Sequence, residues 1–185
     1  MASAFNQIIY TIGHSTRSLE EFISMLQSFS VKYLVDIRRF PNSGKYPHFN
    51  KQNLELYLPE HNIKYTHIEQ LGGRRQGVKD SLNNRWRNAS FRGYADYMQT
   101  QEFKSAIGEL EKIAEKETTA FMCSEAVWWR CHRSMVSDYL KAKGWDVEHI
   151  MAVNKIEEHP YTSPARVVNG NVFYHDENSI NFQTK

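Results

Sequence analysis

Two thiols, a carboxylate and an imidazole lie close together in one short stretch of this 185-residue chain, at Cys123, Glu125, Cys131 and His132. A thiolate can attack an electrophilic centre, and a carboxylate or an imidazole can transfer a proton to or from a substrate. A carboxylate beside thiols and an imidazole also has a shifted proton affinity that suits acid–base work. The stretch therefore predicts nucleophilic or acid–base chemistry.

This stretch is predicted to join a strand to a helix. The apolar run 120–123 is typical of a buried strand, and apolar residues then recur at helical spacing, at Met135, Val136, Tyr139 and Leu140. A helix that begins near Cys131 would expose this thiol to the positive end of the helix dipole and to Arg130 and Arg133, which favours the thiolate. Cys131 is therefore the better nucleophile candidate. The same helix would turn His132 inward and leave Arg133 more exposed.

Further candidates follow other predicted strands, and the carboxyl ends of parallel strands meet at one edge of a sheet. We therefore expect all of these side chains to converge there. The candidate catalytic residues are Cys131, Glu125, His14, Cys123, His132 and Asp36. The candidate ligand-binding residues are Ser15, Arg38, Gly72, Gly73, Arg74, Arg75, Trp128, Arg130 and Arg133.

Several of these residues also have a purely structural interpretation. Cys123 can be a small apolar filler of a strand, and His132 on an apolar helix face can be a hydrogen-bonded core histidine. Asp36 can pair with Arg38 or cap a turn. Arginine and tryptophan side chains can also simply cover the apolar surface of an irregular loop.

The elements that must position these groups alternate between strands and helices. Five β-prone runs are predicted strands, at 8–12, 33–37, 64–68, 120–123 and 147–151. Predicted helices lie between them: one is capped by Ser18 and Glu21, one ends at Pro59, and one divides near Thr100. The alternation predicts an α/β fold with a mainly parallel five-stranded sheet and helices on both faces. Asn169-Gly170 predicts a C-terminal β-hairpin extension.

The chain is long enough for one domain, so residues 1–185 are predicted to form a single domain with a core at about 8–151 and a hairpin tail at 160–185. There are 23 basic and 21 acidic residues, and the net charge of +2 gives no global reason to expect nucleic acid or an anionic membrane as a partner. No apolar leader or membrane span is visible, so we expect a cytoplasmic protein without a membrane partner. Two cysteines in a chain of this length indicate reduced thiols rather than a disulfide framework.

A bound phosphate is the ligand that the loops favour. Backbone amides and guanidiniums of the loop 72–77 can hold a phosphate, and the segments 85–87 and 128–130 add aromatic and cationic surfaces on which bases can stack. We therefore expect an anionic small molecule or nucleic acid as the partner. No cofactor or metal is expected: the seven-residue gap between the thiols is unusual for structural zinc, and Cys131 and His132 would splay about 100° apart on a helix.

Five ordered motifs resemble the domain-of-unknown-function 488 family. They are Thr11–Ser15, Asp36–Arg38 with Pro41 and Ser43, Leu71–Gly73, Cys123–Glu125 and Cys131–Arg133, and the resemblance spans about residues 8 to 151. It implies an α/β fold and a set of signature positions, but no reaction.

Three functions are compatible with these residues. The favoured one is an enzyme with a Cys/Glu/His site that acts on an anionic, phosphorylated ligand such as a nucleotide or nucleic acid. The alternatives are a non-catalytic module that binds nucleic acid or a modified base, and a thiol redox sensor in which Cys123 and Cys131 join reversibly. The sequence leaves the reaction and the oligomeric state open.

Overall fold

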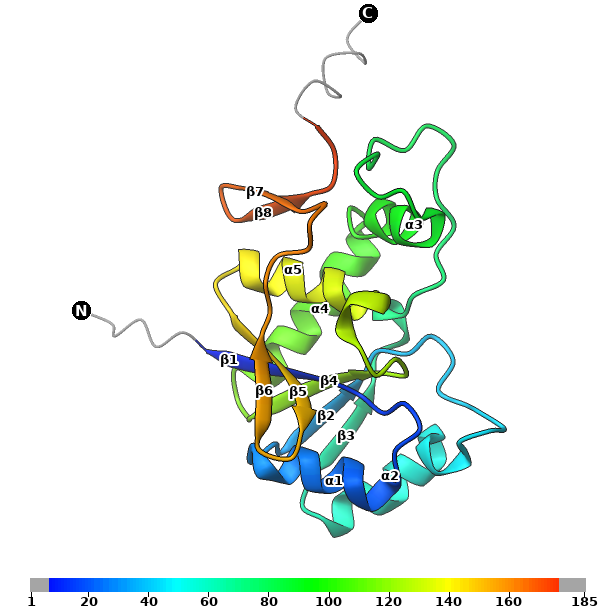
Figure 1. Cartoon of the computed structure of the whole chain (residues 1–185), viewed down its shortest axis with the longest axis vertical. Coiled ribbons are helices and arrows are strands. Elements are labelled where there is room, and N and C mark those ends of the chain that lie inside the picture. Colours follow the sequence, from blue (N-terminus) through cyan, green and yellow to red (C-terminus); the bar gives the residue numbers. More distant parts are fainter. Residues whose placement is uncertain (1–6, 177–185) are drawn as a thin grey trace, which may run out of the picture.

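The apolar runs of the sequence form a six-stranded sheet with the order β3-β2-β4-β1-β5-β6. The computed structural model describes residues 7–176 (Figure 1). Its first five strands are parallel, and β6 is antiparallel to β5. The strands of this sheet are β1 (Ile8–Gly13), β2 (Tyr33–Asp36), β3 (Lys64–His67), β4 (Thr119–Cys123), β5 (Asp146–Ala152) and β6 (Lys155–Glu158).

The five predicted parallel strands are all present, and the mainly parallel α/β fold is confirmed. The edge strand β6 was not predicted. Its four residues are all exposed, so neither an apolar run nor an inside–outside alternation marks it. Its position follows from a tight turn at Asn154, where φ is 57° and the chain folds back along β5.

Helices cover both faces of the sheet, as predicted. In Figure 1 α1 and α2 lie on one side of the sheet, and α3, α4 and α5 lie on the other. Each side has its own apolar cluster: Phe22 and Leu54 belong to the first, and Phe103 and Met135 to the second. The helices are α1 (Leu19–Ser28), α2 (Lys51–Glu60), α3 (Ala89–Tyr97), α4 (Gln101–Ala114) and α5 (Arg133–Ala142).

The helix boundaries follow mostly from side-chain caps. The Ser18 hydroxyl accepts a hydrogen bond from the Glu21 amide, and the Thr100 hydroxyl accepts one from the Phe103 amide, so both predicted caps are confirmed. The prediction that Pro59 ends the second helix was wrong, because α2 continues to Glu60. A proline this close to the end of a helix disturbs fewer backbone hydrogen bonds than one in its interior.

Alternation along β4 decides which way its reactive residue points. Phe121 packs in the cluster under α4 and α5, whereas Ala120 and Met122 pack in the cluster under α1 and α2. Because side chains alternate across a sheet, Cys123 continues the side of Phe121. The thiol therefore faces the layer that contains α5.

The predicted C-terminal hairpin is present as β7 (Arg166–Val168) and β8 (Asn171–Phe173). Its turn residues Asn169 and Gly170 both have positive φ, as a two-residue hairpin turn requires. The Tyr174 hydroxyl donates a hydrogen bond of 2.8 Å to buried Asp138 on α5, which ties the hairpin to the core. Residues 177–185 of the predicted tail lie outside the described residues.

A buried polar chain lies between the sheet, α5 and the segment that leads to the hairpin. His149 on β5 contacts the Thr11 hydroxyl at 2.6 Å and His159 at 2.9 Å, and His159 contacts Asp138 at 3.0 Å. The indole of Trp128 stacks on His149, with ring centroids 4.7 Å apart. Satisfied networks of this kind fix one arrangement of the core, because every buried polar group needs its partner.

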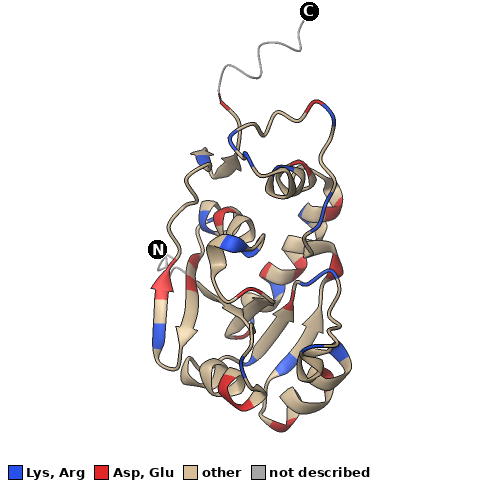
Figure 2. Ribbon diagram, turned by 45° about the vertical axis from the view of Figure 1, so that its right-hand side comes forward, with Lys and Arg blue, Asp and Glu red and all other residues tan. Residues whose placement is uncertain are grey.

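Figure 2 shows basic and acidic residues distributed over all parts of the ribbon, in keeping with the small net charge. Any electrostatic preference for a ligand must therefore be local. None of the helices within residues 7–176 is long and apolar enough to cross a membrane.

Candidate active site

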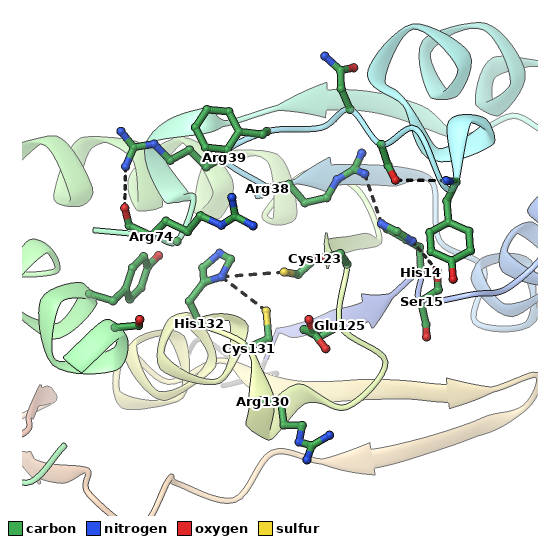
Figure 3. A pocket seen from close by; sticks show the side chains of 18 of the residues that line it. His14, Ser15, Arg38, Arg39, Arg74, Cys123, Glu125, Arg130, Cys131 and His132 are labelled. Carbon is green, nitrogen blue, oxygen red and sulfur yellow. Dashed lines mark hydrogen bonds between the residues drawn. The ribbon is translucent and has the colours of Figure 1, made fainter. Parts of the chain in front are cut away.

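The carboxyl ends of β1, β2 and β4 open into a cavity of about 750 Å³ (Figure 3). This is the edge at which the sequence predicted a site. The predicted site residues that line the cavity are His14, Ser15, Arg38, Gly73, Arg74, Cys123, Glu125, Arg130, Cys131 and His132. They come from five separate segments of the chain.

Backbone pairing that continues beyond the strand ends holds the pocket floor together. The amides of His14 and Ser15 donate to the carbonyls of Cys123 and Ser124, at 3.1 and 2.9 Å. Glycine is required at the end of β1, because a Cβ atom on Gly13 would lie 1.7 Å from the carbonyl oxygen of Glu125. Strand pairing thus fixes the imidazole-bearing segment beside the first cysteine.

Two sulfurs and an imidazole form a compact cluster within this pocket. Nδ1 of His132 lies 3.5 Å from Sγ of Cys131 and 3.9 Å from Sγ of Cys123. All three atoms lie within 4.8 Å of one another. Nε2 of His132 lies 3.2 Å from the carbonyl oxygen of Ile37, which can only accept a hydrogen bond. Nε2 therefore carries the proton, and the lone pair of Nδ1 faces the sulfurs (Figure 3).

The local backbone explains why neighbouring residues converge on one point. Cys131 is extended, with φ −129° and ψ 147°, and His132 caps α5, which begins at Arg133. The helix begins two residues after Cys131, so the prediction that this cysteine lies in the first helical turn was wrong, and so was the expected splaying of the two side chains. A short 3₁₀ turn at Trp128–Arg130 precedes the extended residue and delays the helix.

Arg133 is buried, with 1% of its surface exposed, so the prediction that it is more exposed was wrong. Its guanidinium donates to the carbonyls of Glu125 and Ala126, at 3.3 and 3.4 Å, and makes no ion pair with a carboxylate in residues 7–176. Buried charges need an opposite charge nearby. An ionised thiol of the adjacent cluster can supply one.

The two thiols titrate unequally, in the opposite order to that predicted. The hydrogen bond from Cys131 lowers the pKa of Cys123 well below its ordinary value against the opposing effect of burial, and the charge of Arg133 lowers it further. Burial, and then the hydrogen bond and charge of Cys123, raise the pKa of Cys131 well above its ordinary value. Cys123 is therefore the sulfur that ionises first, and Cys131 is its hydrogen-bond donor.

His14 lies in the pocket as a neutral imidazole. Its ring stacks on Phe49 at 4.3 Å, and its Nδ1 lies 3.0 Å from the Ser15 carbonyl oxygen, to which it donates. Nε2 consequently faces the Arg38 guanidinium at 3.3 Å as an acceptor. Burial, followed by the charge of Arg38, lowers the pKa of His14 to about 4. At neutral pH this side chain is a hydrogen-bond acceptor.

Asp36 lies outside the pocket lining and is fully buried. Its carboxylate pairs with Arg38 at 2.5 Å and accepts a hydrogen bond of 2.7 Å from the Tyr65 hydroxyl. With these partners Asp36 has the structural role that the sequence allowed for it. It positions Arg38, which in turn contacts His14.

Four other predicted ligand-binding residues, Gly72, Arg75, Trp128 and Arg133, also lie outside the lining. Gly72 packs against the backbone of Arg39, where a Cβ would lie 2.6 Å from the nearest atom. The Arg75 guanidinium lies 3.8 Å above the Tyr97 ring. Trp128 is buried against His149. These residues pack in the structure around the pocket and do not form its surface.

Unpaired cations surround the pocket. Arg39, Lys45, Arg74 and Arg130 line it and form no ion pair with any residue in the described part of the chain. Glu125 is exposed and is the carboxylate among the lining residues. An anion that entered this pocket would therefore meet mostly positive charge.

Part of the lining was not among the predicted site residues, namely Thr16, Arg39, Phe40, Asn42, Ser43, Lys45, Tyr46, Asn88, Ser90, Phe91, Tyr94 and Ser124. Several of these residues lie in the long loop 37–46 that follows β2. A long loop at the carboxyl end of a parallel strand was the signal that could have identified them.

Within residues 7–176, the side chains that are grouped closely enough to hold a metal ion are those of Cys123, Cys131 and His132. His14 has the right chemistry for a ligand, but its Nε2 already accepts from Arg38.

Fold and pocket together define an open α/β protein with a thiol–imidazole cluster at the carboxyl ends of its parallel strands. The family model for the domain of unknown function DUF488 matches residues 18–140, which is more than half of the chain. The chain therefore belongs to the DUF488 family. The matched region includes both cysteines and His132, whereas the 11–15 motif precedes it. No curated protein and no solved structure matches the chain.

Proposed function

We propose that this protein is an enzyme that acts on a phosphate-bearing ligand, a nucleotide or an end of a nucleic acid, with the Cys123–Cys131–His132 cluster as its reactive centre. The observation that carries the proposal is the convergence of this cluster, a free carboxylate and four unpaired cations on a single pocket. Titratable groups gathered in one crevice are typical of catalytic sites.

The charges of the pocket favour a phosphate as the group that is bound. Arg39, Lys45, Arg74 and Arg130 have no carboxylate partner in residues 7–176, so a phosphate could pair with them without breaking an existing ion pair. Arginine pairs with phosphate in two-point geometry, which also orients the ligand.

The remaining lining suits a planar base beside the phosphate. Phe40 is exposed over 59% of its surface, and the Arg39 and Arg74 guanidiniums lie 5.6 and 6.0 Å from its ring. Asn42 and Asn88 add amides that can both donate and accept hydrogen bonds. Aromatic faces next to cations and amides favour a ligand that contains a base over a simple phosphate ester.

Two kinds of group are then available for chemistry. The cluster supplies an ionised sulfur close to an imidazole, and Glu125 supplies an exposed carboxylate that can accept or donate a proton at the pocket. We assign proton transfer to Glu125. His14 and Arg38 orient the ligand, because Asp36 already holds the Arg38 guanidinium in place.

The first test measures binding. Thermal shift would be recorded with inorganic phosphate, adenosine and guanosine mono-, di- and triphosphates, and a short single strand with and without a 5′ phosphate. We expect the phosphorylated compounds to raise the melting temperature and their unphosphorylated counterparts to leave it unchanged. Arg74→Gln and Arg130→Gln should each weaken binding and its dependence on salt. Lys112→Gln, which makes the same change of charge at an exposed position of α4, should leave binding and its salt dependence unchanged.

The second test measures turnover. Ligands that bind would be incubated with the protein under reducing conditions, and their conversion followed by mass spectrometry. Cys123→Ser and Glu125→Gln should abolish product formation with the fold retained, whereas Lys112→Gln should leave it intact. Salt-dependent binding without conversion by the unmodified protein would instead identify a binding module. If none of the phosphorylated compounds bound, the proposal would fail.

A further inference from the structure

The two sulfur–nitrogen separations in the cluster are close to those between ligands of one metal ion. A tetrahedral zinc site has Zn–S distances of about 2.3 Å and Zn–N distances of about 2.0–2.1 Å, which places sulfur and nitrogen about 3.5 Å apart along each edge. The two separations from Nδ1 of His132 are 3.5 Å to Cys131 and 3.9 Å to Cys123. A metal ion could therefore be accommodated with small movements of the side chains.

The surroundings orient two of the three ligands. The Ile37 carbonyl holds the proton of His132 on Nε2, which leaves Nδ1 free to coordinate. The Arg133 amide donates to Sγ of Cys131 at 3.4 Å, a contact that stabilises a coordinated thiolate. Hydrogen bonds of this kind to histidine and thiolate ligands are a regular part of metal sites, because they fix the tautomer and the orientation of each ligand.

The nearby arginines do not oppose such a metal. Arg133 and Arg38 are both buried, and Arg38 is already paired with Asp36. A divalent ion with two thiolates and a neutral imidazole carries no net charge. The cluster with its metal would thus carry no net positive charge next to these guanidiniums.

We propose that Cys123, Cys131 and His132 bind one zinc ion, with a fourth position that opens into the pocket. Two thiolates and an imidazole select zinc over magnesium or calcium, which prefer oxygen ligands. Both sulfurs are almost fully buried, with 5% and 4% of their residues' surfaces exposed, which suits ligands better than free nucleophiles.

A site with three protein ligands and an open position is of the catalytic rather than the structural type. A water molecule or a phosphate oxygen could occupy that position in the cavity, which Arg74 and Glu125 also line. This catalytic consequence rests on the proposed function. Metal binding itself is measured without a substrate, so the two proposals can fail separately.

The test uses the full chain, freed of metal with a chelator and kept reduced. Zinc bound after dialysis is measured by elemental analysis, and Co²⁺ is titrated as a spectroscopic probe. We expect one zinc per chain, one Co²⁺ with a thiolate-to-metal charge-transfer band and the intense visible bands of tetrahedral coordination, and competition between the two metals.

Variants identify the ligands. Cys123→Ser, Cys131→Ser and His132→Gln should each weaken zinc binding by about 100-fold or more, beyond the 10–100-fold effect of losing an outer contact. His61→Gln, at an exposed histidine beyond the end of α2, should bind zinc as the unmodified chain does. Circular dichroism of each variant checks the fold. The Co²⁺ titration of the unmodified chain needs no variant and therefore decides the question even if a variant fails to fold.

Two results would overturn the zinc site. One is a reduced, metal-free chain that takes up no stoichiometric zinc and gives no charge-transfer band with Co²⁺. The other is zinc binding that survives replacement of both cysteines, which would locate the metal on other residues. Turnover that depends on Cys123 in the absence of zinc would leave the proposed function intact and exclude the zinc site. Zinc binding by a chain that binds no phosphorylated compound would support the zinc site and exclude the proposed function.

Discussion

Acid should destabilise this protein through two histidines that are buried in the neutral form. Burial, and then the neighbouring His159, lower the pKa of His149 from 6.5 to about 2, and burial and Arg38 lower that of His14 to about 4. In the unfolded chain both imidazoles titrate near 6.5. The unfolded state therefore binds more protons below that pH, so stability that is complete above pH 6.5 is lost as the pH falls towards the folded pKa values.

The size of the effect follows from the pKa values. Each histidine loses about 1.4 kcal/mol of stability per pH unit within this window. At pH 5, about 1.5 units below the unfolded pKa, each should have lost about 2 kcal/mol, and the two together about 4 kcal/mol. This is a large share of the about 5–15 kcal/mol by which domains are normally stable.

Urea unfolding at pH 7, 6 and 5, followed by tryptophan fluorescence with reductant and chelator present, measures this loss. The Trp128 indole stacks on His149 and should report directly on the opening of its surroundings. His149→Gln keeps an amide that can bond to Thr11 and His159 but cannot take up a proton. The free energy of unfolding of this variant should fall by about 2 kcal/mol less between pH 7 and pH 5 than that of the unmodified chain.

Carboxylates contribute equally to both proteins, so the difference between the two curves isolates the histidine. His61→Gln removes an exposed histidine and should give a curve parallel to that of the unmodified chain. If the curves for His149→Gln and the unmodified chain were parallel, burial would not hold this imidazole neutral, and the predicted acid sensitivity would be wrong.

Three further substitutions test other parts of the structure. Asp36→Asn should cost about 3–5 kcal/mol in urea unfolding, because it leaves the buried Arg38 guanidinium without its ion pair; a loss below about 1 kcal/mol would contradict this. Gly73→Ala should displace the His132 ring, since a Cβ there would lie 2.9 Å from Nδ1, and so weaken Co²⁺ binding with the fold retained. Gly44→Ala, where a Cβ meets nothing within 4 Å, is its control, and equal Co²⁺ affinities for the two variants would count against the cluster geometry. Tyr174→Phe should lower stability by about 1–2 kcal/mol, because the hydroxyl bonds to buried Asp138; an unchanged unfolding midpoint would show that this contact does not hold the hairpin.

Local patterns were sufficient for most of the fold. The Ser18 cap and the Asn169-Gly170 turn act through contacts between residues close in sequence, and the apolar runs of the strands are visible as local patterns. The structure contains the elements that these patterns predict. The topology of a parallel sheet then brought most of the candidate residues to one edge. The edge strand β6 was not predicted, because its exposed residues carry no apolar pattern.

Tertiary structure decided what the reactive residues can do. The residue types near Cys131 were evident from the sequence, but an extended backbone at that residue, rather than a helix, brings its sulfur to His132. Burial of Arg133 and the order in which the thiols ionise depend on partners that are distant along the chain. The fold class and the set of reactive side chains could be predicted from the sequence alone. Their charges and contacts were decided only by packing, because desolvation and the short-range field of neighbouring groups depend on three-dimensional distances that a linear pattern does not contain.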